Sequence, residues 1–156
     1  MLNDAELDDE MRRLARHTVS DCLARYGEPL DYSERSLISF GRIVEASAER
    51  LRAATKNDQA PSERQLFALC LTLGAYLGEV IRRARGGAWV RSDSVDGPVP
   101  AVAFDGAAIY PTERIRRALV GEAPDLGGLL ASIRTQHPAA RPRCAQLCSC
   151  CAELPA

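Results

Sequence analysis

The sequence predicts an α+β fold in which three long N-terminal helices pack on a small antiparallel β-hairpin sheet, closed by one or two further helices. Three observations support this prediction. Apolar residues recur at spacings of three and four through most of residues 4–85. Short apolar runs separated by turn residues follow over residues 88–110, and a helical pattern returns at residues 111–120.

The first helix is expected over residues 4–26, because its apolar positions follow helical spacing and its first turn is acidic, which favours the positive end of a helix dipole. Gly27 predicts its end. A second helix is expected from Asp31, where Glu34 stands at capping-box spacing, to about Thr55.

The third helix is expected over residues 61–85. Pro61 suits a first helical position, and Ser62 with Gln65 matches a capping box. This helix carries the longest apolar stretch of the chain, residues 66–81, which predicts a helix surrounded by protein. The stretch contains an acidic residue and is shorter than a bilayer span, so no transmembrane segment is expected.

The chain then changes to short strands. The first is expected at residues 88–91 and the second at 99–104, where Pro100 indicates a sheet edge. Asp105-Gly106 is a two-residue hairpin signal, and a return strand is expected over residues 107–110.

The rest of the chain predicts two closing helices and a tail. The fourth helix is expected over residues 111–120 and a weaker fifth over 125–133. Residues 1–136 are thus interpreted as one globular domain. Residues 137–156 are rich in Cys, Pro, Ala and Arg, and are expected to be loosely ordered.

Composition narrows the functional classes. The chain has 156 residues and a net charge of −1, so nothing in its overall charge favours nucleic acid or an acidic membrane. The acidic N-terminus has no apolar signal region, which predicts a cytoplasmic protein. The motifs of serine hydrolases, nucleotide-binding loops and zinc proteases are absent from the sequence. A homo-oligomer is left open.

The C-terminal cysteines are the most conspicuous motif. Cys144, Cys148, Cys150 and Cys151 crowd together, and four thiolates are a ligand set for zinc or another soft metal. Reversible thiol chemistry is an alternative, because nearby arginines lower thiol pKa values. A dispensable tail without a cofactor is the third interpretation. Cys22 and Cys70 lie in helical patterns and are interpreted as small buried hydrophobes.

A polar stripe runs along the otherwise apolar third helix. Thr72, Tyr76, Glu79 and Arg83 step by four, three and four, so they share one face. The simpler interpretation is a Glu79–Arg83 ion pair near the surface. The alternative is a catalytic groove, with Glu79 as acid or base and Tyr76 as a hydrogen-bond donor.

Trp89, the only tryptophan, follows a diglycine and is interpreted either as packing the hairpin on the third helix or as an exposed anchor for a partner. The stretch of residues 82–91 carries four positive charges and no negative one. It is the best candidate surface for an acidic partner. Its arginines are Arg82, Arg83, Arg85 and Arg91.

The segment LGAYLGEVIRRARGGAWV, followed by an apolar hairpin and YPTERIRRAL, resembles a family of small uncharacterised bacterial domains. In these, a helix with Gly-Ala-x-x-Gly-Glu runs into a Gly-Gly-x-Trp hairpin, and a Pro-x-x-x-Ile/Val-Arg helix follows. The resemblance covers about residues 70–120. The matching residues are Gly74, Gly78, Glu79, Gly86, Gly87, Trp89, Pro111 and Arg116.

The resemblance implies no reaction, but some similar small proteins act beside toxins as immunity or accessory factors. The leading hypothesis is therefore a non-enzymatic cytosolic domain that binds another protein through the hairpin, Trp89 and the neighbouring arginines. A metal- or thiol-handling protein that uses the cysteine cluster is the first alternative. A small enzyme with Glu79 and Tyr76 in a groove is the second.

Overall fold

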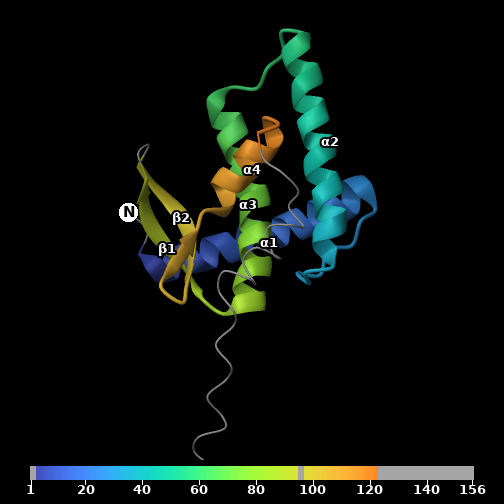
Figure 1. Cartoon of the computed structure of the whole chain (residues 1–156). Coiled ribbons are helices and arrows are strands. Elements are labelled where there is room, and N and C mark those ends of the chain that lie inside the picture. Colours follow the sequence, from blue (N-terminus) through green and yellow to red (C-terminus); the bar gives the residue numbers. More distant parts are fainter. Residues whose placement is uncertain (1–2, 95–96, 123–156) are drawn as a thin grey trace, which may run out of the picture.

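The computed structural model describes residues 3–94 and 97–122. Four helices and a three-stranded antiparallel sheet form an α+β fold, as the sequence predicts (Figure 1). The elements in chain order are α1 (Asp4–Tyr26), α2 (Ser36–Lys56), α3 (Glu63–Arg85), β1 (Ala88–Ser94), β2 (Gly97–Phe104), β3 (Ala107–Ile109) and α4 (Pro111–Leu119). The predicted fifth helix and the cysteine-rich tail lie outside the described residues.

The ends of α1 and α3 are set by local chemistry. Ser62 and Gln65 form the expected capping box at the start of α3. At the start of α1, the side chain of Asn3 accepts a hydrogen bond from the backbone of Glu6, whose own side chain accepts one from Asn3. Gly27 ends α1 in the left-handed conformation with φ 67°, where an L side chain would be strained.

The start of α2 differs from the prediction. The helix begins at Ser36, and the expected capping box of Asp31 and Glu34 does not form there. The Asp31 carboxylate instead accepts a hydrogen bond from the Ser33 backbone at 2.9 Å, which makes a local turn. Tyr32 inside this turn has a positive φ of 63°, which interrupts any helix at this point.

The sheet has the order β1-β2-β3, with Trp89 opposite Val102 and Val102 opposite Ile109. Asp105 and Gly106 both have positive φ, as a two-residue hairpin turn requires. The prediction that Pro100 marks an edge strand is wrong, because β2 is the central strand. The proline is accommodated because β3 pairs only with residues 102–104, so the ladder on that side stops before Pro100.

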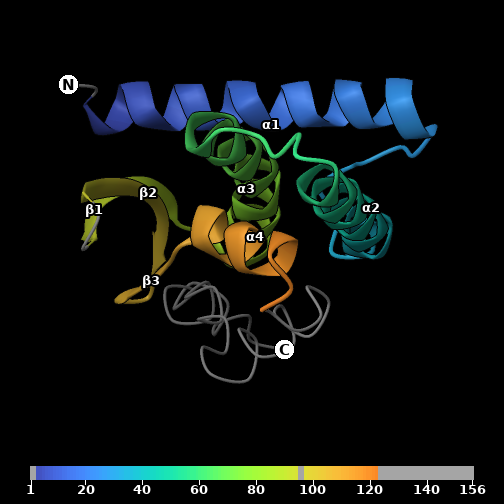
Figure 2. The same ribbon diagram turned by 90° about the horizontal axis from the view of Figure 1, so that it is seen from above.

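The central element is α3. Figure 2 shows α1 on one side of it and α4 on the other, with the sheet and α2 at opposite flanks. Gly74 and Gly78 allow close approach: a Cβ at Gly74 would lie 2.8 Å from the Thr112 Cα, and a Cβ at Gly78 would overlap the Trp89 ring. The sequence of α3 thus fixes where α4 and β1 pack.

Burial divides α3 into two halves. Every residue from 73 to 81 is buried, whereas Phe67 is 52% exposed and Leu69 is 36% exposed. The expectation that protein surrounds this helix from residue 66 is therefore wrong for its first turns. The reason is the length of α4, which packs on α3 near Gly78 and Gly74 and ends after nine residues.

By length and composition alone, α3 also passes as a candidate membrane span. It has 23 residues, a window of mean hydropathy 1.2, and 56% of that window is buried within the protein. A single helix of this kind is weak evidence for a membrane span, so the expectation that residues 66–81 do not cross a membrane stays a prediction. A core helix of a soluble protein has the same properties.

Candidate functional site

A buried carboxylate stands where α3 meets β1. Glu79 is 1% exposed, and its Oε1 accepts hydrogen bonds from Arg82 Nε at 2.8 Å and from Trp89 Nε1 at 2.9 Å. Its Oε2 accepts one from Arg82 Nη2 at 3.0 Å, and Arg83 Nε lies 3.6 Å from the same oxygen. One carboxylate therefore holds two arginines and the indole of the first strand.

The electrostatics of Glu79 favour its charged form. Burial acts to raise the pKa of the carboxyl. The hydrogen bonds from Arg82 and Trp89, together with the charges of Arg82 and Arg83, outweigh that effect and hold the pKa below its usual value. An ionised carboxylate that accepts three hydrogen bonds is a structural anchor, and it carries no proton to donate at neutral pH.

Tyr76 is also an interior residue. Its side chain is 0% exposed, its hydroxyl lies 2.6 Å from Ser36 Oγ, and it accepts a hydrogen bond from the Tyr32 backbone at 3.2 Å. Its ring packs against Phe40 with centroids 4.8 Å apart. The hypothesis of a groove that presents Glu79 and Tyr76 to a substrate is wrong for this fold, because both are buried and face different elements.

Trp89 packs on α3, as one of its two interpretations predicts. The side chain is 1% exposed, and its ring lies over Gly78. The other interpretation, an exposed aromatic anchor for a partner, is wrong because the whole indole is enclosed and its N–H is bonded to Glu79. Trp89 positions Glu79, and through it the arginines.

The structure places further charges around the arginines of α3. Arg83 is half-exposed, and its Cζ lies 3.8 Å from the ring centroid of Tyr32, a cation–π contact. Burial raises the pKa of the Tyr32 hydroxyl, while the charges of Arg83 and of the exposed Arg16 act in the opposite direction. Arg16 therefore lies near the same tyrosine.

An ion pair on α1 lies on the same surface. Arg12 forms an ion pair with Asp8 at 2.6 Å, and the charge of Asp8 also acts on Arg82. Two helices thus contribute four arginines to one surface, where Asp8 pairs with Arg12 and the buried Glu79 holds Arg82 and Arg83. We refer to Arg12, Arg16, Arg82 and Arg83 as the basic face.

The other two predicted arginines, like Arg82, are only partly exposed. Arg85 and Arg91 are each half-buried and have interactions of their own within the protein. The sequence stretch of four positive charges is therefore divided. Arg82 and Arg83 belong to the basic face, whereas Arg85 ends α3 and Arg91 lies in β1.

Cys22 and Cys70 are buried, as predicted, and desolvation raises the pKa of each thiol to about 11. Both are therefore protonated and unreactive at neutral pH. The predicted metal or thiol site at Cys144, Cys148, Cys150 and Cys151 lies outside the described residues and stays a prediction. Within residues 3–94 and 97–122, no group of three or more His, Cys, Asp or Glu side chains is arranged to hold a metal.

Comparison with protein-family models, with curated proteins and with solved structures finds no match for this chain.

Reasoning from the sequence missed Tyr32, Arg12 and Arg16 as members of the site. Tyr32 lies in a turn that was expected to begin a helix, and the arginines of α1 belong to a helix far from α3 in the sequence. Arg12 and Arg16 are four residues apart, which places them on one face of α1. No pattern in the sequence of α1 indicates that this face meets the end of α3.

Proposed function

We propose that this chain is a non-enzymatic protein-binding domain, and that its basic face contacts an acidic surface of a partner protein. The observation that carries the proposal is the concentration of Arg12, Arg16, Arg82 and Arg83 on one surface, where Glu79, the carboxylate that holds Arg82 and Arg83, is buried. A surface with excess positive charge favours an acidic partner and accelerates its association.

The arginines differ in how they can contribute. Arg82 is tied to Glu79 by two hydrogen bonds, and Arg83 is held against the Tyr32 ring. Such restraint reduces the entropy lost when a partner binds. Arg16 is exposed and has no ion-pair partner among the residues that the structure describes, which makes it the most available charge.

The biological type we propose is an immunity or accessory protein of the bacterial cytoplasm. Support for this part comes from the resemblance of residues 70–120 to small bacterial domains, some of which act beside toxins. An immunity protein binds a protein toxin, so this type is consistent with a protein-binding surface.

The test is affinity capture from the source bacterium with the intact chain as bait. We expect a stoichiometric acidic protein that is retained at about 50 mM salt and released as salt screens the charges. Arg16→Glu should weaken its retention at least tenfold. Arg64→Glu, an exposed arginine at the opposite end of α3, is the matched control and should retain it fully. Equal capture by both variants, or no specific protein at all, would refute the proposal.

A further inference from the structure

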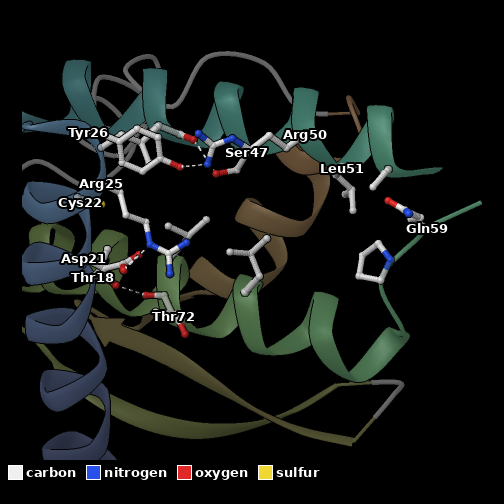
Figure 3. A pocket seen from close by; sticks show the side chains of 15 residues that line it. Thr18, Asp21, Cys22, Arg25, Tyr26, Ser47, Arg50, Leu51, Gln59 and Thr72 are labelled. Carbon is white, nitrogen blue, oxygen red and sulfur yellow. Dashed lines mark hydrogen bonds and ion pairs between the residues drawn. The ribbon is translucent and has the colours of Figure 1, made fainter. Parts of the chain in front are cut away.

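A pit opens between the C-terminal half of α1, the middle of α2 and the N-terminal half of α3 (Figure 3). Gln59, from the loop between α2 and α3, lies at one end of it, and Pro61 of the same loop also lines it. Its volume is about 350 Å³, at the lower end of the range of small-molecule sites. The pit lies at the opposite end of α3 from the basic face, so it is a separate surface.

The walls of the pit are mainly apolar. Contact between water and an apolar surface is unfavourable, so binding of an apolar ligand that displaces the water from the pit is favoured. Cys22 adds a neutral thiol, because burial raises its pKa to about 11. The aliphatic lining residues are Ile43, Leu51, Ala54, Leu69 and Leu73.

The hydroxyl groups in the wall are already satisfied. Thr18 donates to the Thr72 carbonyl oxygen at 2.8 Å, Thr72 donates to Ala68 O at 2.8 Å, and Ser47 donates to Ile43 O at 2.8 Å. The hydroxyl protons of these side chains are therefore already used in hydrogen bonds within the protein and are not left to bind a ligand. The polar recognition at this site falls to the charged groups at its rim.

At the rim, Arg50 is held in place without a counter-ion. Its Nη1 donates to the Tyr26 hydroxyl at 2.8 Å, and its Cζ lies 5.2 Å from the centroid of that ring. No carboxylate pairs with Arg50 within the described part of the chain. Arg25, also at the rim, pairs with Asp21 at 2.6 Å. Two guanidinium groups thus face one carboxylate, which leaves the rim positive (Figure 3).

We propose that this pit binds a small amphipathic monocarboxylate. The aliphatic chain lies along Leu51, Leu69 and Leu73, and the carboxylate accepts hydrogen bonds from the guanidinium of Arg50. A guanidinium offers five donors in a plane, of which Tyr26 takes one, so a carboxylate can bind it in a bidentate manner. This binding activity is independent of the proposed protein contact.

The test is isothermal titration calorimetry, which measures the affinity of the intact protein for octanoate and, as a matched probe, for octylammonium. The two have the same chain and opposite charge. We expect octanoate to bind and octylammonium not to bind. Arg50→Gln should weaken octanoate binding about tenfold or more, because it removes a charged hydrogen-bond donor. Arg52→Gln, an exposed arginine of α2 that does not line the pit, is the control and should bind like the unmodified chain.

A second variant tests the apolar part of the site. Leu69 is partly exposed, so Leu69→Gln should leave the fold intact while weakening octanoate binding severalfold. Circular dichroism verifies folding of each variant. Equal binding of both probes, or unchanged octanoate affinity in Arg50→Gln, would overturn the proposal. Binding of acetyl-trileucine without binding of octanoate would also overturn it, in favour of the C-terminus of a partner protein.

Discussion

The two halves of α3 have similar apolar sequences and different surroundings. Over residues 73–81 the helix is enclosed by α1, α4 and the sheet, whereas Phe67 and Leu69 in its first turns are exposed. Hydrophobicity along a helix therefore shows which residues favour burial, but the length of the neighbouring elements decides which of them are buried. The two regions also divide the proposed functions, since the buried half ends at the basic face and the exposed half forms one wall of the pit.

The largest expected difference between the regions concerns buried and exposed ion pairs. Glu79→Ala leaves Arg82 and the Trp89 N–H without their partner, so it should lower the free energy of unfolding by about 4 kcal/mol. Glu113→Ala is the matched control, because Glu113 pairs with Arg116 at the same i,i+3 spacing but is exposed. It should change the free energy by less than about 0.5 kcal/mol. Urea denaturation measures both, and similar losses would refute the distinction.

Truncation of leucines compares the two halves directly. Leu77 is 0% exposed and Leu69 is 36% exposed, and both lie in the same helix, so the change in helix propensity cancels. Leu77→Ala should cost about 3 kcal/mol of unfolding free energy because it opens a cavity. Leu69→Ala should cost less than about 1 kcal/mol. If thermal and urea denaturation gave equal losses, the first turns of α3 would have to be covered.

The next effect concerns the glycines. Gly78→Ala should lower the free energy of unfolding by about 2 kcal/mol, because the added methyl group meets the enclosed ring of Trp89. Gly41→Ala in α2 is the control, since no atom lies within 4 Å of its Cβ position. That variant should gain about 0.5–1 kcal/mol from helix propensity. A stabilised Gly78→Ala variant would show that Trp89 does not pack on α3 in this way.

Local signals in the sequence predicted what depends on local chemistry. Ser62 with Gln65, Gly27 and Asp105-Gly106 each set an element boundary through their own backbone or capping preferences, and the structure confirms each one. Asp31 offered a capping signal too, but its carboxylate bonds to Ser33 in a turn instead. Two local structures compete for the same side chain there, and tertiary contacts of Tyr32 select the turn.

The candidate site depended more strongly on tertiary structure. The spacing along α3 predicted a Glu79–Arg83 pair near the surface, but Arg82 makes the shorter contact and the carboxylate is buried. The reason is that the chain reverses after Gly86 and brings Trp89 back onto α3, which encloses Glu79. Arg16 joins the basic face only because α1 crosses α3. No pattern within either helix specifies that crossing.

The smallest expected effect is the acid sensitivity that Glu79 gives to the buried half of α3. The pKa of Glu79 is lower in the folded protein than in the unfolded chain. The pairing of Glu79 therefore contributes fully to the free energy of unfolding at pH values above the unfolded-state pKa of about 4.3. Below that pH the unfolded state binds the proton first, and the contribution is lost as the pH falls through the folded pKa. Glu79→Gln has no proton to bind, so its unfolding free energy should fall less steeply with pH in this window.

The comparison of slopes isolates Glu79 from other acids. Glu10 and Glu113 also have lowered pKa values because of their arginine partners, and both remain in the Glu79→Gln variant. Their contribution to the pH dependence therefore cancels in the difference between the two proteins. Urea denaturation at several values between about pH 5 and pH 3 measures that difference. If the free energies of unfolding of the two proteins changed in parallel with pH, the pKa of Glu79 would be the same in the folded and unfolded states. That result would contradict the hydrogen bonds from Arg82 and Trp89 to its carboxylate.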